Sequence, residues 1–510
     1  MTRTTRILGA LAALAVAFCF ARAVTAQQPA DDGKRPQGEY VILTDIKAGG
    51  AYDKVVTEFK KLLHPEAKVV RYDPAKWEEL KKSLRGIKPR YVTVVLRPDT
   101  LDVNFQGMFL KLCTEMDDDP LCDFSYGYVT GATEEEAVKF VKNIAKAAKQ
   151  GLPHRILAVP TIGSGPEEPS AKSTRTETTG INEGYFVDWP VVRVTFGETD
   201  KKHMTPEEIT AWMTRNISDF SGNGVIMMGG HGSPRGIVGN ISAADVRKLD
   251  LTAAVVFNYA CLTGCVSRAY DWIEEEDVKS GAYVNIKEKK VEPTESIALS
   301  VIAAGASAYV ASIEPRLAGP AMTGELAHAL AEGVPLGDVR RREYDMLIMA
   351  YLGWGEKSLV ITPFADGTPR NEAGKDPQTA RRNRLMMSGV GTVLFGDPAL
   401  KICRKNMSVV TTKLSKADKG YSLECETDPA MVSGIYCYLF DQYQHNAGGE
   451  DGMAWNMRLY ATADLPKDVK PVTGVELVEA TGADGAKIET RYLAWSVEES
   501  DGGRRLHVKV

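Results

Sequence analysis

The chain has 510 residues, of which 44% are apolar and 25% charged. These values exclude disordered and collagen-like classes, and the length predicts two or three domains rather than one. The formal net charge is −5, and no basic segment of the kind that nucleic-acid binding needs is visible, so no nucleic-acid partner is expected.

Residues 1–26 have the pattern of a secretory signal peptide. Arg3 and Arg6 precede an apolar stretch at 7–20, and small residues lead to a predicted cleavage after Ala26. The apolar stretch is shorter than the ~20 residues that span a bilayer, although a membrane anchor is the alternative. No later segment could span, so we expect no membrane span after signal removal and a secreted or periplasmic protein. Losing Arg3, Arg6 and Arg22 would change the charge from −5 to −5 − 3 = −8.

Residues 27–150 predict an α/β module. Apolar strands are expected at 40–44, 67–72 and 91–96, with helices at 52–63 and 77–84. Thr133 and Glu136 form the pattern of a capping box for a helix that runs through 144. Alternating strands and helices predict a parallel sheet with helices on both faces.

Residues 151–403 predict a second alternating series. A strand near 154–163 precedes a Ser-, Thr- and Gly-rich loop to about 188, and Thr205 caps a helix. A strand at 225–228, a short helix capped by Ser242 with Asp245, and a strand at 252–260 follow. A helix at 296–304, a strand at 307–313 and a long helix at 336–352 complete the series.

Residues 404–510 change in pattern after LFGDPALKI. Alternating segments such as YSLECE and RLHVKV are joined by Gly- and Asp-rich turns. This favours a small all-β sandwich of roughly 100 residues.

Two residues with reactive side chains each follow an apolar strand. His231 comes after 225–228, and Cys261 ends TAAVVFNYAC. Functional groups collect at the carboxyl ends of parallel strands, so the two residues are expected to meet if the strands are neighbours. A thiol with a pKa of about 8.5 needs an imidazole to become a nucleophilic thiolate. Gly232 would let the backbone approach a substrate.

Structural alternatives exist for this pair. Buried cysteines are usually packing groups. A zinc site would need a second pair of ligands beside Cys261 and Cys265, and no such pair is present. We therefore expect no metal and no cofactor.

Several motifs in order resemble the gingipain-like family of cysteine peptidases, within the caspase-like clan. They are the strand ending in His231-Gly232, the Ala-Cys-x-x-Gly pattern in YACLTG, the stretch ESIALSVIAAGASAYVAS and VLFGDPAL. The resemblance implies a caspase-like parallel-sheet α/β sandwich with helices on both faces. It also implies a preceding α/β module and a terminal immunoglobulin-like domain.

The resemblance implies roles for individual residues. Cys261 would be the nucleophile and His231 the general base or acid, with the N–H groups of Gly232 and Cys261 as oxyanion donors. Glu167 or Glu168 is the candidate acid that orients the histidine, with a solvated loop acid as the alternative.

The specificity pocket departs from the trypsin-like members of the family. Tyr259 and Leu317 are the candidates for the pocket, with Leu317 near the position where those members carry a tryptophan. Specificity for arginine or lysine is therefore not implied. The insertion at 267–293 is expected to form a solvated hairpin or lid.

The leading function is a secreted cysteine endopeptidase that acts on protein or peptide substrates through a thioester. The alternatives are a sortase-like transpeptidase that processes exported proteins, and a non-catalytic exported binding protein.

The mature chain would hold seven cysteines, an odd number. Disulfides are predicted between Cys113 and Cys122 and between Cys425 and Cys437. Cys261 is predicted to stay outside any structural disulfide.

Overall fold

The protein was analysed as a computed structural model. The structure describes residues 18–22, 39–117, 121–159, 180–186, 189–195, 222–228, 232–237, 241–258, 260–273, 285–314, 334–353, 389–402, 410–417, 420–427, 460–466, 469, 471–481, 487, 494–500 and 503–509. The chain divides into two compact units, residues 35–407 and residues 1–34 with 408–510.

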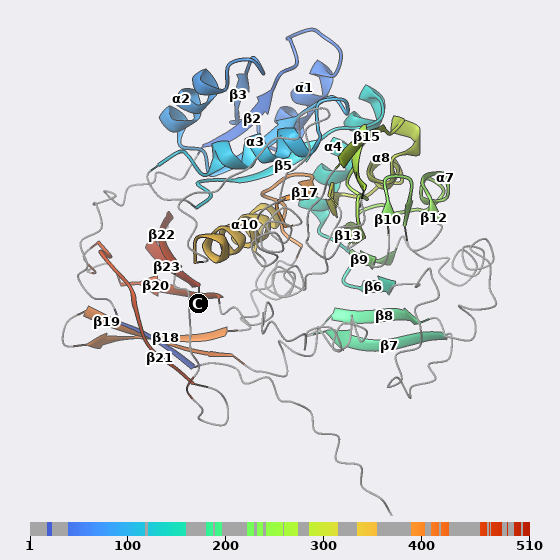
Figure 1. Ribbon diagram of the computed structural model, residues 1–510. Coiled ribbons are helices and arrows are strands. Elements are labelled where there is room, and N and C mark those ends of the chain that lie inside the picture. The colour runs from blue at the N-terminus through green and yellow to red at the C-terminus, as the bar shows by residue number, and fades with distance from the viewer. Residues whose placement is uncertain are drawn as a thin grey trace, which may run out of the picture. The chain divides into compact units, whose positions relative to one another are not determined.

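The larger unit is built on one sheet of eleven strands (Figure 1). The order across the sheet is β3 (Lys68–Arg71), β2 (Tyr40–Thr44), β4 (Tyr91–Val95), β5 (Ser125–Val129), β17 (Thr392–Phe395), β16 (Ala308–Ser312), β13 (Val255–Asn258), β9 (Val225–Met228), β6 (Ile156–Val159), β8 (Trp189–Thr195) and β7 (Gly180–Phe186). Strands from both predicted α/β series therefore share one sheet.

The sheet is mixed, with parallel pairs in the majority. Strands β2 to β5 are parallel to one another, and so are β6, β8, β9, β13 and β16. Strand β17 is antiparallel to β16, and β7 is antiparallel to β8. The expected parallel sheet is thus correct for most pairs, but wrong at these two.

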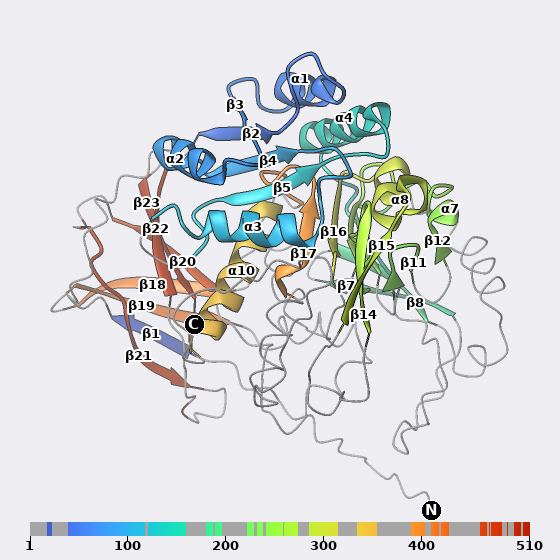
Figure 2. The same cartoon turned by 45° about the horizontal axis from the view of Figure 1, so that its top comes forward.

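Helices cover the sheet in two groups (Figure 2). In one group α1 (Asp53–Leu62) packs on α4 (Glu134–Gln150), α4 on α8 (Ile297–Ala303) and α8 on α7 (Ala243–Val246). The other group holds α2 (Trp77–Ile87), α3 (Val103–Cys113) and α10 (Leu336–Gly353), with α10 against β5 and β17. The predicted helices of both series that fall within the described residues are confirmed, whereas α3 had no prediction.

Local sequence signals explain where these helices begin. Thr133 accepts a hydrogen bond from the Glu136 N–H at 3.2 Å, as predicted, but the Glu136 carboxylate accepts from Arg247 instead of closing the box. Ser242 and Asp245 form the complete reciprocal box at α7. Side-chain acceptors at the N-cap satisfy N–H groups that have no partner within the helix.

Strands also occur where none was predicted. β7 occupies residues that were expected to be loop, so that prediction is wrong for 180–186. A small sheet of β10 (Gly232–Ser233), β11 (Gly236–Ile237) and β12 (Ile241–Ser242) follows β9. β14 (Arg268–Ile273) and β15 (Asn285–Lys290) form an antiparallel ribbon, which confirms the predicted hairpin.

The smaller unit is all-β in its described residues. β18 (Val410–Ala417), β19 (Gly420–Thr427), β1 (Phe18–Arg22) and β21 (Glu476–Thr481) form one sheet. β20 (Tyr460–Leu465), β23 (Gly503–Lys509) and β22 (Ala494–Ser500) form another. Both sheets contribute residues to one core cluster. The immunoglobulin-like assignment, and the leader that would include β1, stay predictions.

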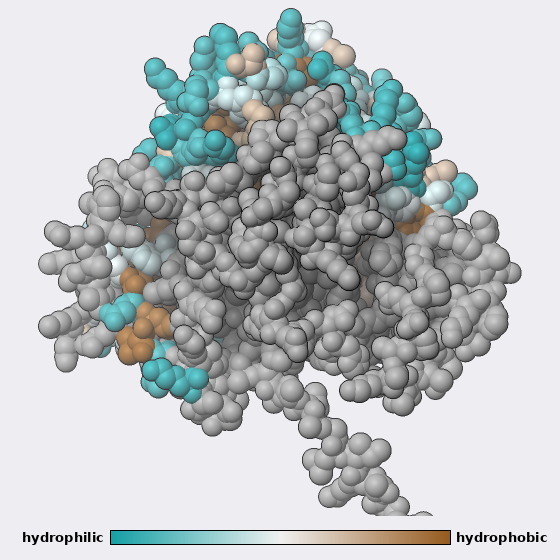
Figure 3. Space-filling model, viewed as in Figure 1, coloured by the Kyte–Doolittle hydropathy of each residue, from teal (hydrophilic) through white to brown (hydrophobic). Residues whose placement is uncertain are grey.

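The surface of the described residues shows few large apolar side chains. Only Leu62, Val69 and Val478 are exposed large hydrophobics in this part of the chain. The helices at the top of the view in Figure 3 carry mainly hydrophilic residues. Among the helices that the structure describes, none is long and apolar enough to cross a membrane.

The first predicted disulfide is absent. Cys113 and Cys122 are both buried thiols, and Cys113 Sγ donates a hydrogen bond to the Phe124 carbonyl at 3.2 Å. Burial, followed by hydrogen bonding to Cys113, raises the pKa of Cys122 well above its ordinary value. Cys437 lies outside the described residues, so the second predicted bridge stays a prediction.

Candidate functional site

The two strands that lead to His231 and Cys261 are direct neighbours. β9 and β13 pair in parallel, and their last paired residues are Met228 and Asn258. His231 is three residues beyond Met228 (231 − 228 = 3), and Cys261 is three residues beyond Asn258 (261 − 258 = 3). The two strands that precede the predicted catalytic positions therefore end together at the same edge of the sheet, and α7 lies between them in the chain as expected.

Gly232 lies directly against the segment that carries Cys261. A Cβ atom placed on Gly232 would be 2.6 Å from Ala260 Cβ, 2.7 Å from the Cys261 carbonyl oxygen and 2.8 Å from Thr263 Cγ2. Real Cβ atoms do not approach other atoms so closely, so only glycine fits without moving one of the two segments. The residue that follows His231 is therefore in contact with Cys261.

The backbone turns sharply at Cys261. Leu262, the next residue, has φ = 60°, in the left-handed region that costs an L-amino acid roughly 1–2 kcal/mol. The Leu262 N–H donates to the Glu314 carbonyl at 3.2 Å, and the Cys265 N–H donates to the Leu262 carbonyl at 3.2 Å. These bonds hold the unfavourable conformation in place, so the position of Cys261 is fixed by its neighbours.

A buried hydroxyl braces the Cys261 segment on both sides. Tyr309, in the adjacent strand β16, accepts from Asn258 Nδ2 at 2.9 Å and donates to the Thr263 carbonyl at 3.1 Å. Asn258 Oδ1 in turn accepts from the Ala260 N–H at 3.0 Å. Burial raises the pKa of Tyr309 beyond its usual range, so its hydroxyl stays neutral and can both donate and accept.

A buried acid, Glu314, lies two residues after the end of β16 and contacts this segment. Glu314 is only 2% exposed, and its backbone N–H and carbonyl both bond the Ser312 hydroxyl, at 3.3 and 2.9 Å. The Gly264 N–H donates to the Ser312 carbonyl at 2.7 Å. Backbone hydrogen bonds therefore join Ser312 and Glu314 to Gly264 and Leu262. The residue that carries the Glu314 carboxyl group is thus bonded directly to the residue after Cys261.

Cys261 and Cys265 differ in their surroundings. Cys261 is half-buried, whereas Cys265 is 2% exposed. Cys265 Sγ donates to the Ile313 carbonyl at 3.5 Å, and both residues carry thiols. A nucleophile must reach a substrate, so Cys261 is the better placed of the two.

The other predicted site residues lie outside the described residues. These are His231, Glu167, Glu168, Tyr259 and Leu317. The structure thus brings Gly232 and Cys261 together, and the roles of the other five stay predictions.

Sequence reasoning did not identify the residues that hold Cys261 in place. Asn258 carried a usable signal, because it is a polar residue at the end of an otherwise apolar strand, and buried polar side chains need partners. Tyr309 and Glu314 gave no such signal, since their partners are distant in the sequence.

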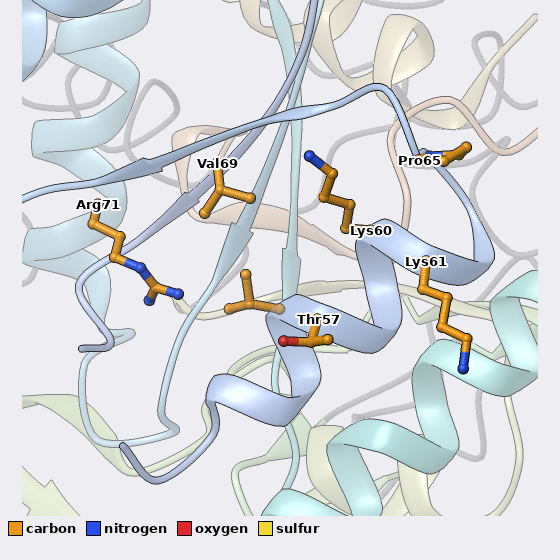
Figure 4. Close-up of a pocket in the computed structure, with 7 residues that line it drawn as sticks. Thr57, Lys60, Lys61, Pro65, Val69 and Arg71 are labelled. Carbon is orange, nitrogen blue, oxygen red and sulfur yellow. The ribbon is translucent and has the colours of Figure 1, made fainter. Parts of the chain in front are cut away.

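A surface pocket lies elsewhere, between α1 and β3 (Figure 4). It has a volume of about 630 Å³. Its lining residues are Val56, Thr57, Lys60, Lys61, Pro65, Val69 and Arg71. None of the predicted site residues lines it.

We predict that Gly232→Ala lowers kcat/KM for a cleaved peptide by roughly tenfold or more, because the added methyl group must push apart two segments that carry the site. Gly236→Ala is the matched control, since a Cβ there would meet no atom nearer than 3.6 Å. The measurement is the initial rate of peptide cleavage by each variant. Equal activity in the two would show that the close contact has no role in catalysis.

Comparison with known proteins gave similar structures but no similar sequence. No protein-family model and no curated protein matches the chain. The complex of Porphyromonas gingivalis RgpB pro- and mature domains is similar at 12% identity over 93% of each chain, with a TM-score of 0.44. The Arg-specific cysteine proteinase gingipain R is similar at 12% identity over 94% of this chain and 93% of that chain, with a TM-score of 0.39. A further structure, described as a protease, is similar at 10% identity over 75% and 82% of the two chains, with a TM-score of 0.41.

Proposed function

We propose that the protein is an exported cysteine endopeptidase in which Cys261 and His231 form the catalytic dyad. The observation that carries the proposal is the parallel register of β9 and β13, which end together at Met228 and Asn258. The contact of Gly232 with the Cys261 carbonyl supports it, because it joins the residue after His231 to the nucleophile.

In the first step the Cys261 thiolate attacks the carbonyl carbon of the scissile peptide bond. A C–S bond forms, and the electron pair of the C=O group moves onto oxygen. When the tetrahedral intermediate collapses, the C–N bond breaks and the His231 imidazolium gives its proton to the leaving amine. The products of this step are a thioester on Cys261 and a free amine.

In the second step His231 takes a proton from water, and the resulting hydroxide attacks the thioester. The C–S bond breaks, which releases a carboxylic acid and returns the Cys261 thiolate with the His231 imidazolium. The N–H groups of Gly232 and Cys261 would hold the negative oxygen in both tetrahedral intermediates. The chain would act outside the cytoplasm, after removal of residues 1–26.

Incubation of the protein with a peptide library, with and without a nucleophilic amine, tests this function. An endopeptidase gives products with a free carboxylate under both conditions. Products that carry the added amine in an amide bond would instead indicate a transpeptidase. A chain that binds exported proteins but yields no new termini from any peptide would be a binding protein, and the proposal would fail.

A further inference from the structure

Three consecutive residues, 295–297, contact both of the segments that carry the proposed dyad. They follow the β14–β15 ribbon and end at Ile297, the first residue of α8, in the stretch that begins ESIAL. We call residues 295–297 the bridging segment. Figure 2 shows α8 beside the small β10–β11–β12 sheet and the ribbon.

One side of the bridging segment reaches the segment after Cys261. The Ser296 hydroxyl donates to the Cys265 carbonyl at 2.7 Å. The same oxygen accepts from the Leu299 N–H at 3.2 Å, so it also caps α8. Ser296 has no exposed surface, and a buried hydroxyl that makes two bonds is held in one orientation.

The other side reaches the segment after Gly232. The Ile297 N–H donates to the Pro234 carbonyl at 2.9 Å. The Glu295 carboxylate and the Arg235 guanidinium form an ion pair at 2.9 Å. Because this ion pair is half exposed on both sides, the backbone bond is the stronger of the two links.

The bridging segment therefore joins the two segments at a second place, in addition to their direct contact. Gly232 lies in close contact with Ala260 and Cys261, and the Pro234 and Cys265 carbonyls accept hydrogen bonds from the adjacent residues Ile297 and Ser296. A shift of about 1 Å in a catalytic group can cost on the order of 100-fold in rate.

We propose that Ser296 is a positioning residue for Cys261, acting through the Cys265 carbonyl while the next residue holds the Gly232 segment. This rests on the proposed function, since the groups it aligns are those of the proposed dyad. Ser296 itself does not contact substrate.

The test compares Ser296→Ala and Ser296→Thr with Thr133→Ala. Thr133 caps α4 through an acceptor bond of the same length, 3.2 Å, so its removal reports the loss of a cap without the loss of the bridge. Two quantities are measured in each variant: the rate at which iodoacetamide alkylates Cys261, and kcat and KM for a cleaved peptide.

We expect Ser296→Ala to lower kcat and the alkylation rate roughly tenfold with little change in KM, and Ser296→Thr to restore both. Thr133→Ala should lower the midpoint of thermal unfolding by a few degrees and leave both rates unchanged. If Ser296→Ala does not fold, Arg235→Ala removes a half-exposed link instead and should lower both rates about threefold.

Unchanged rates in Ser296→Ala would overturn the proposal, as would an equal loss in Thr133→Ala. If Ser296→Ala is unfolded, unchanged rates in Arg235→Ala would overturn it. If the wild-type protein cleaves no peptide, the peptidase function fails, but the alkylation rates still decide whether Ser296 positions Cys261.

Discussion

Cys261→Ala is expected to reduce peptide hydrolysis to background, a loss on the order of 10⁴-fold or more, because no thioester can form without the thiol. The fold should be kept, since the side chain is half-buried and Leu262, Thr263 and Ala260 make hydrogen bonds that hold the surrounding turn. Initial rates and the thermal unfolding midpoint measure the two effects separately.

Cys265→Ala is the matched control for this substitution. Cys265 is buried and donates to a carbonyl, so its loss should cost about 1 kcal/mol of stability and leave the rate nearly unchanged. The opposite pattern, an active Cys261→Ala and an inactive Cys265→Ala, would assign the nucleophile to Cys265.

His231→Ala is expected to lower kcat/KM by about 10²- to 10⁴-fold, the range that general acid and base catalysis contributes. The reason is the proposed role of His231, which the common end of β9 and β13 at Met228 and Asn258 supports. In that role its imidazole takes the thiol proton and later gives it to the leaving amine. Rates measured over a range of pH give the size of the loss.

His154→Ala provides the comparison. His154 is an exposed histidine before β6 whose ring lies 4.4 Å from that of Trp189, so the same substitution removes an imidazole from the surface. Its activity should match the wild-type protein. A loss smaller than tenfold in His231→Ala would mean that another group activates the thiol.

The sequence was informative where a short segment determines its own structure. The buried strands at 225–228 and 255–258 could be recognised because all of their residues are apolar except Asn258, the last one. Ser242 and Asp245 identified the start of α7. From these, the neighbouring position of β9 and β13 could be expected in advance.

Other features depend on partners far along the chain. β7 forms because it pairs with β8, although residues 180–186 contain two glycines and look like loop. Tyr309 braces the Cys261 segment from 46 residues away, and nothing in its own strand indicates this. The predicted disulfide between Cys113 and Cys122 was wrong, because both residues are buried thiols in the structure. Their short separation in the sequence favoured a bridge, but it could not show whether the two sulfur atoms are bonded.

If Cys261 is an activated nucleophile, iodoacetamide should alkylate it faster than it alkylates an ordinary thiol. At pH 6 an ordinary thiol with a pKa of about 8.5 is on the order of 0.3% thiolate and reacts slowly with iodoacetamide. Mass spectrometry of the folded, non-reduced protein locates the label on each cysteine.

We expect Cys261 to be labelled first at pH 6, well before the buried thiols of Cys113, Cys122 and Cys265, and His231→Ala to remove this advantage. Cys261 is not an activated nucleophile if it reacts no faster than an unfolded peptide thiol, or if the protein contains a stoichiometric disulfide between Cys261 and Cys265.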